Sequence, residues 1–143
     1  MSQNENKNKD EEKDSNLSVH NLDYEKETQL FGDIAQEWAD KISKERGRSS
    51  QKNKISQLRA FYDKVYDLNE KAEGLNDEKY KKSIYPFVVM LNSKVKYAKT
   101  RNLVTDSFVK MINECVKSCE NSSDKLNNFK LFFEAVIGFY PKK

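Results

Sequence analysis

The sequence predicts an all-α protein: a single compact bundle of about five helices behind a disordered N-terminal tail. Apolar residues recur at helical spacing through the body of the chain. Two prolines and four glycines leave few breaks, and no segment shows the alternation that is typical of a strand. The length of 143 residues suits one domain. We therefore divide the chain into a polar tail, residues 1–18, and a helical-bundle domain, residues 19–143.

The tail differs from the rest of the chain in composition and charge. Residues 1–18 hold almost no apolar side chain, so they cannot bury enough surface to offset the entropy lost on ordering. Three lysines against five acidic residues give the tail a net charge of −2, so the +3 of the whole chain leaves +5 for the remainder. This basic excess suits an anionic partner.

Two helices are expected in the first half of the domain. The first spans about residues 24–44 and has a strong apolar face. A basic, flexible link follows at residues 46–50, and the second helix spans about residues 50–71, with Ser49 or Ser50 as its cap. The inward-facing residues of these helices are Leu30, Phe31, Ile34, Ala35, Trp38, Ile42, Ile55, Leu58, Phe61, Tyr62, Val65 and Leu68.

Three helices are expected in the second half. The third spans about residues 77–100, where Pro86 either begins a second segment or kinks a continuous helix. The fourth spans about residues 106–120 with Thr105 at its N-cap, and the fifth spans about residues 124–140. The fifth is the most apolar element, so we expect it to be central in the bundle.

Several functional classes find no support in the sequence. Cys115 and Cys119 continue an apolar helical stripe and are expected in the core. A zinc site would need more ligands than these two cysteines and the one histidine, His20, supply. The sequence contains no glycine-rich phosphate loop and no nucleophile motif, so we expect no enzyme activity, no cofactor and no metal. It lacks a secretory signal and an apolar run of ~20 residues, which favours a reduced, cytoplasmic protein without membrane contact.

Two helical segments carry bases beside their apolar faces. The more informative one, residues 83–101, contains no acidic residue. Lys94 and Arg101 lie seven residues apart on one side of it with Tyr97 between them, whereas Lys99 falls on the other side. Lysines on the solvent side of a helix are common, so this pattern alone does not distinguish a binding face from an ordinary surface.

The other basic segment, residues 49–62, begins next to Arg48. Lys52 and Arg59 again lie seven residues apart, and the unpaired N–H groups of a helix start attract phosphate. If the two segments pack side by side, their bases and two tyrosines form one patch suited to RNA. That patch would comprise Arg48, Lys52, Arg59, Lys94, Arg101, Tyr62 and Tyr97.

Three blocks of the sequence resemble the small all-helical subunit of type III-A CRISPR–Cas interference complexes, the Csm complexes. The blocks are residues 54–62, 86–101 and 127–140, and their order and spacing match that family. The third block is expected to be core. The resemblance implies a non-catalytic subunit in antiviral defence.

The resemblance also implies partners. Members of that family stack in several copies along the guide RNA, opposite a repeated backbone subunit, and hold the guide–target RNA duplex through basic side chains. Cleavage belongs to the backbone and large subunits. The implied partners are therefore guide RNA, target RNA, the backbone and large subunits, and other copies of the chain.

The implied RNA-binding residues are basic. Carried over by position from the first two blocks, they are Lys54, Arg59, Lys94, Lys99 and Arg101. Arg48 and Lys52 join them only as neighbours. Thr100 stands where a glycine is expected before the closing arginine, which leaves the direction of Arg101 open. The alternatives are a helical adaptor that meets acidic protein surfaces without touching nucleic acid, and a helical nucleic-acid binder outside CRISPR systems.

Overall fold

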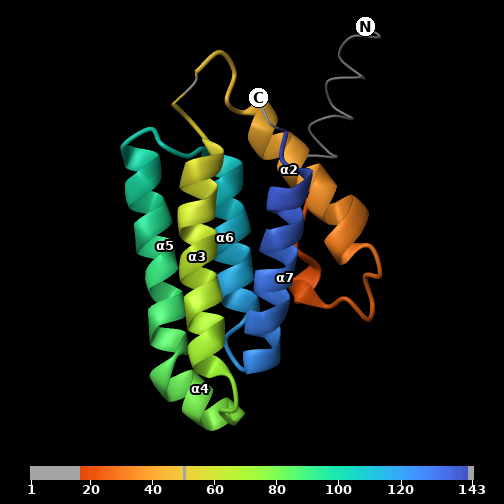
Figure 1. The fold of residues 1–143 in the computed structure, drawn as a ribbon, viewed down its shortest axis with the longest axis vertical. Helices are drawn as coiled ribbons and strands as arrows, with labels where there is room; N and C mark the ends of the chain where they lie inside the picture. The colour runs from red at the N-terminus through yellow and green to blue at the C-terminus, as the bar shows by residue number, and fades with distance from the viewer. Residues whose placement is uncertain (1–16, 50, 142–143) are drawn as a thin grey trace, which may run out of the picture.

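The described part of the chain is a bundle of six α-helices (Figure 1). The computed structural model describes residues 17–49 and 51–141, and no strand occurs among them. The all-α class is confirmed, and the helix count is six rather than five. The elements are η1 (His20–Leu22, a 3₁₀ turn), η2 (Leu30–Ile34, a π-helical turn), α2 (Ala35–Lys44), α3 (Ile55–Ala72), α4 (Asp77–Ser83), α5 (Tyr85–Thr100), α6 (Asp106–Ser118) and α7 (Ser123–Phe139).

Pro86 accounts for the extra helix. It lies in the first turn of α5, and Ile84 separates this helix from the short α4. A proline has no N–H to donate and fits the first turn of a helix, where that N–H would have no partner. Pro86 therefore begins a second segment instead of kinking one long helix.

The first expected helix begins later than predicted, at Ala35 rather than near residue 24. Asp23 Oδ1 accepts hydrogen bonds from the backbone N–H groups of Glu25 and Lys26 at 3.2 Å each. Gly32 has the non-helical angles φ −115 and ψ −108. Such local side-chain bonds compete with helix formation, so a turn stands where the apolar spacing predicted a helix.

The second expected helix also begins later, at Ile55 instead of residue 50. The Ser49 hydroxyl accepts from the Gln51 N–H at 3.2 Å and does not cap α3, while Ser50 lies outside the described residues. Asn53, with a positive φ of 53, turns the chain just before the helix. The hydrogen bonds of Asn53 to the rest of the bundle explain why α3 begins only at Ile55.

Most of the predicted tail lies outside the described residues, which begin at Leu17. Leu17 and Ser18 contact the bundle: the Lys110 ammonium donates to Leu17 O at 3.0 Å, and Trp38 Nε1 donates to Ser18 O at 3.2 Å. The chain then makes the η1 turn, where the fully buried Leu22 packs into the core. Residues 17–22 are thus part of the folded domain.

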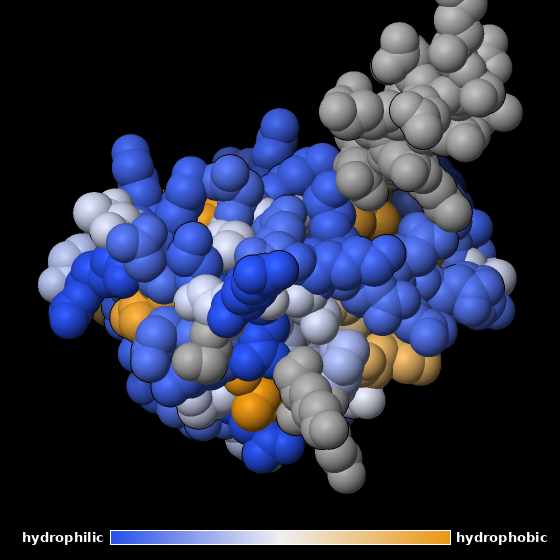
Figure 2. Space-filling model, turned by 90° about the horizontal axis from the view of Figure 1, so that it is seen from above, coloured by the Kyte–Doolittle hydropathy of each residue, from blue (hydrophilic) through white to orange (hydrophobic). Residues whose placement is uncertain are grey.

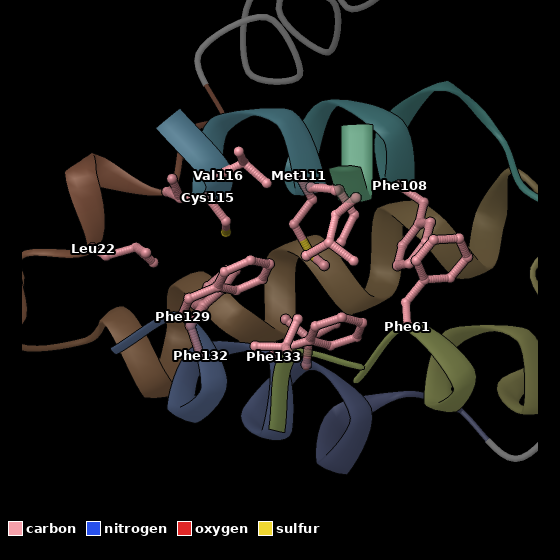
Figure 3. Packing of buried hydrophobic residues seen from close by; sticks show 14 of the residues in the cluster. Leu22, Phe61, Phe108, Met111, Cys115, Val116, Phe129, Phe132 and Phe133 are labelled. Atoms are coloured by element: carbon pink, nitrogen blue, oxygen red, sulfur yellow. The ribbon is translucent and has the colours of Figure 1, made fainter. Parts of the chain in front are cut away.

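Aromatic rings fill the centre of the bundle (Figure 3). The ring of Phe133 on α7 lies 5.9 Å from that of Phe108 on α6 and 5.7 Å from that of Tyr62 on α3, both edge to face. It also stacks on Phe129 at 6.1 Å, and Phe61 meets Phe108 at 5.4 Å. Because α7 packs against α2, α3 and α6, the last helix is central, as its apolar composition predicted.

Both cysteines lie in the core, as expected. Cys115 and Cys119 are fully buried free thiols on the inner side and at the end of α6. Burial raises the pKa of both thiols well above its ordinary value, because the thiolate would lose its hydration. Their role in this fold is packing.

Candidate nucleic-acid interface

Two connections meet at one end of the bundle, at the top of Figure 1. One joins α2 to α3, and the other joins α5 to α6. Asn53 links them: its backbone N–H donates to Leu103 O at 2.9 Å, and its Oδ1 accepts from the Thr105 N–H at 3.0 Å. Its Nδ2 donates to Thr105 Oγ1 at 2.7 Å and to Ile42 O at 2.9 Å. This one side chain therefore fixes both connections to the end of α2.

The end of α7 reaches the same point. The Tyr140 hydroxyl donates to the backbone carbonyl of Asn53 at 2.5 Å. Burial raises the pKa of Tyr140, and the adjacent Arg46 opposes that shift. Asn53 is fully buried, and its backbone and side-chain polar groups all have partners, so burying it leaves no polar group unsatisfied.

Glu45, at the end of α2, caps the start of α6. Its Oε1 accepts from the Ser107 N–H at 3.1 Å and from the Thr105 hydroxyl at 2.5 Å, and its Oε2 accepts from the Ser107 hydroxyl at 2.5 Å. Thr105 is the N-cap residue, as predicted, but its own side chain makes no capping bond. The negative carboxylate interacts favourably with the positive end of the α6 dipole, so the charge of Glu45 stabilises the start of α6.

Bases gather at this end of the molecule. Residues 46–62 and residues 79–105 contain no acidic residue. Seen from above, this end is largely hydrophilic (Figure 2). Of the nearby acids, Asp106 forms an ion pair with Lys99, and Glu45 caps α6. We call the following residues the basic end: Arg46, Arg48, Lys52, Lys54, Lys99 and Arg101.

Arg101 follows the last residue of α5, Thr100, and its direction is now defined. Its Nη1 donates to the Tyr97 hydroxyl at 3.2 Å, and its guanidinium carbon lies 5.6 Å from the centre of the Tyr97 ring. Asn102, with a φ of 61, then turns the chain toward α6. Tyr97 is 62% exposed, so an aromatic face and a cation stand together on the surface.

The remaining two predicted residues, Arg59 and Lys94, lie along the sides of the bundle and on different sides of α3. Arg59 shares a helical face with Tyr62 and Tyr66, which point toward α7: Tyr62 packs on Phe133, and the Lys130 ammonium lies 5.7 Å from the Tyr66 ring. Lys94 lies on the α5 side, beside Lys64. The expected single patch is therefore divided. α3 and α5 do pack together, but they bring together Lys64 and Lys94 rather than Arg59 and Lys94.

The sequence patterns did not single out three residues of this region: Asn53, Glu45 and Lys64. Arg46 belongs to the basic link predicted at residues 46–50 but is not among the predicted RNA-binding residues. Asparagine adopts a positive φ more readily than most residues, so Asn53 is a weak sequence signal for a turn. Apart from Ile42, the partners of Asn53 and of the Glu45 carboxylate lie fifty or more residues away in the chain, and helical periodicity carries no information about them.

The fold and the basic end define a small all-helical protein with a concentrated cationic surface. The model of the family Csm2 Type III-A matches residues 25–142, and the chain belongs to this family. It is therefore a small subunit of the type III-A CRISPR effector complex, as the three sequence blocks indicated. No curated protein and no solved structure matches the chain.

Two further findings concern the residues that the structure describes. No group of three or more histidine, cysteine, aspartate or glutamate side chains among them is arranged to hold a metal ion. No helix within residues 17–49 and 51–141 is long and apolar enough to cross a membrane.

Proposed function

We propose that this subunit holds the guide–target RNA duplex at its basic end, in several copies stacked along the guide RNA. The observation that carries the proposal is the concentration of bases from two acid-free segments at one end of the bundle. The contacts go to phosphate and ribose, because a subunit that serves any guide cannot read bases. Family membership supports the setting, an antiviral effector complex with backbone and large subunits.

The structure of the basic end favours a polyanion over a small ligand. Arg48 and Arg101 are exposed on separate connections, and Lys52 and Lys54 flank the buried Asn53. Charges spread in this way match the repeating phosphates of a nucleic-acid backbone. A few contacts give one copy a weak affinity, and several copies on one RNA supply avidity.

Changing Arg48 and Arg101 to Ala in the assembled complex should weaken target-RNA binding about equally for all sequences. Each phosphate contact that is lost should lower the slope of log affinity against log salt by roughly one unit or less. The measurement is a salt titration of target binding by wild-type and variant complexes. Both side chains are exposed, so the fold should be unaffected.

The matched control removes two charges from the opposite part of the bundle. Lys79 on α4 and Lys117 near the end of α6 are both exposed. Their double alanine variant should retain the wild-type affinity and slope. If the Arg48 and Arg101 variant binds like wild type in a normally assembled complex, the basic end does not contact RNA and the adaptor interpretation replaces this one.

The purified subunit should cleave no RNA in the presence of Mg²⁺, Mn²⁺ or Zn²⁺. A two-metal or general acid–base mechanism needs clustered carboxylates or a histidine near a nucleophile, and the body of the sequence presents no such motif. The measurement is a time course with labelled target RNA. Nuclease activity that purifies with this polypeptide, and that a point substitution abolishes, would contradict a non-catalytic role.

A further inference from the structure

Exposed apolar side chains are concentrated on α5. Of the eight large apolar residues that the structure shows to be exposed, Phe87, Val89, Met90 and Tyr97 belong to this helix. Phe87 is 56% exposed and Met90 is 47% exposed. Lone apolar residues on a surface are ordinary, whereas a cluster on one helix marks a place where another molecule binds.

Phe87 and Met90 border a groove between α3 and α5, which lie side by side in Figure 1. The groove has a volume of about 360 Å³. Its floor consists of Leu68, Ile84 and Leu91, the last two of them buried. An apolar floor with projecting apolar side chains suits the apolar stripe of an amphipathic helix.

Lysines border the same groove. Lys64 and Lys71 of α3 line one side, Lys94 of α5 lines the other, and Asp67 is an acid among the lining side chains. Lys94 lies next to Lys64, and the nearby positive charge of Lys64 lowers the pKa of Lys94. Two cations held together beside an apolar floor gain stability when a partner supplies a carboxylate.

The chemistry of the groove decides between possible occupants. RNA offers phosphates to the lysines but no aliphatic side chains to the floor. A second copy paired by two-fold symmetry places the same surface on both molecules, so the lysines of each copy would approach those of the other. An amphipathic helix with acidic flanks satisfies both the apolar floor and the cations.

We propose that the α3–α5 groove binds an amphipathic helix of a partner protein. Its apolar side chains pack on Phe87 and Met90, and its Asp or Glu side chains pair with Lys64, Lys71 and Lys94. The groove lies along the side of the bundle, and its lining residues do not belong to the basic end. This protein contact is separate from the proposed RNA contact, so an experiment can contradict one of them without contradicting the other.

A library of displayed helical peptides tests the proposal with the full chain as bait. Peptides enriched on wild type should carry apolar residues at i, i+3 or i+4 and i+7, with Asp or Glu beside them. Their affinity, measured with the synthetic peptides, should fall at least about tenfold on Phe87→Glu. Val89→Glu is the matched control, because Val89 is 41% exposed on the same helix and does not line the groove.

A charge exchange adds a second test. The double variant Lys64→Glu, Lys94→Glu should lose the acidic peptides and bind versions in which Lys replaces their acids. Enrichment of basic peptides, or equal binding to wild type and Phe87→Glu, would overturn the proposal. So would sedimentation that shows a wild-type dimer lost in Phe87→Glu, or displacement of the peptide by an RNA oligonucleotide. The salt titration of the basic end should be unchanged in Phe87→Glu, which separates this proposal from the RNA contact.

Discussion

Replacing Phe133 with Asp should unfold the domain. The Phe133 side chain is fully buried and contacts rings from α3, α6 and its own helix. The substitution removes an aromatic side chain, which alone costs about 3–5 kcal/mol. It also places a carboxylate among the rings of Phe108, Phe129 and Tyr62, at a further cost of several kcal/mol. The total approaches the whole stability of a small domain, about 5–15 kcal/mol.

Circular dichroism and thermal melting measure this effect. We expect the helical signal and the cooperative transition to be lost. Phe139→Asp is the matched control on the same helix: Phe139 is 40% exposed, so this change should leave the melting temperature within a few degrees of wild type. A cooperative transition near the wild-type temperature in Phe133→Asp would show that this ring is not part of the core.

Replacing Asn53 with Ala should lower the free energy of unfolding by at least about 3 kcal/mol. The change leaves Ile42 O and the Thr105 N–H without their partner in a buried region, and each such group costs about 1–3 kcal/mol. It also forces an alanine into a positive φ of 53, at about 1–2 kcal/mol. Urea unfolding followed by circular dichroism measures the loss.

Asn102→Ala separates the two causes. Asn102 has a φ of 61 and is exposed, so alanine there should incur only the backbone cost. We expect Asn53→Ala to be the more damaging of the two by at least about 1 kcal/mol. Equal losses would mean that the buried hydrogen bonds of Asn53 contribute nothing. In the assembled complex, Asn53→Ala should also weaken RNA binding, because it frees the connection that carries Arg48 from the one that carries Arg101.

The helical class and most of the core were predictable because they follow from periodicity, although Ile55, expected to face inward, is 38% exposed. The apolar spacing of residues 124–140 placed Phe133 in the core and the last helix at the centre without any tertiary information. The helix starts were less predictable. Asp23 holds a turn and Gly32 departs from helical angles in the stretch before α2, and Asn53 turns the chain just before α3 through bonds to residues 42 and 105.

The candidate site was predictable as a set of bases but not as a surface. Lys94 and Arg59 share a spacing pattern, yet they point to opposite sides of α3 because the rotation of each helix is set by its packing. The groove on α5 could not be predicted either. Phe87 and Met90 stand in an apolar run of the sequence, and only the fold shows that both side chains are exposed among the described residues.

The central position of α7 has a consequence for synthesis. The helices that precede it in the chain emerge from the ribosome before the element that covers their inner faces. Until α7 has been made, the core around Trp38, Phe61 and Phe108 is incomplete, and the Asn53 carbonyl lacks its hydrogen-bond donor, the Tyr140 hydroxyl. The nascent chain therefore exposes apolar helix faces during much of its translation, and such surfaces are prone to aggregation until α7 covers them.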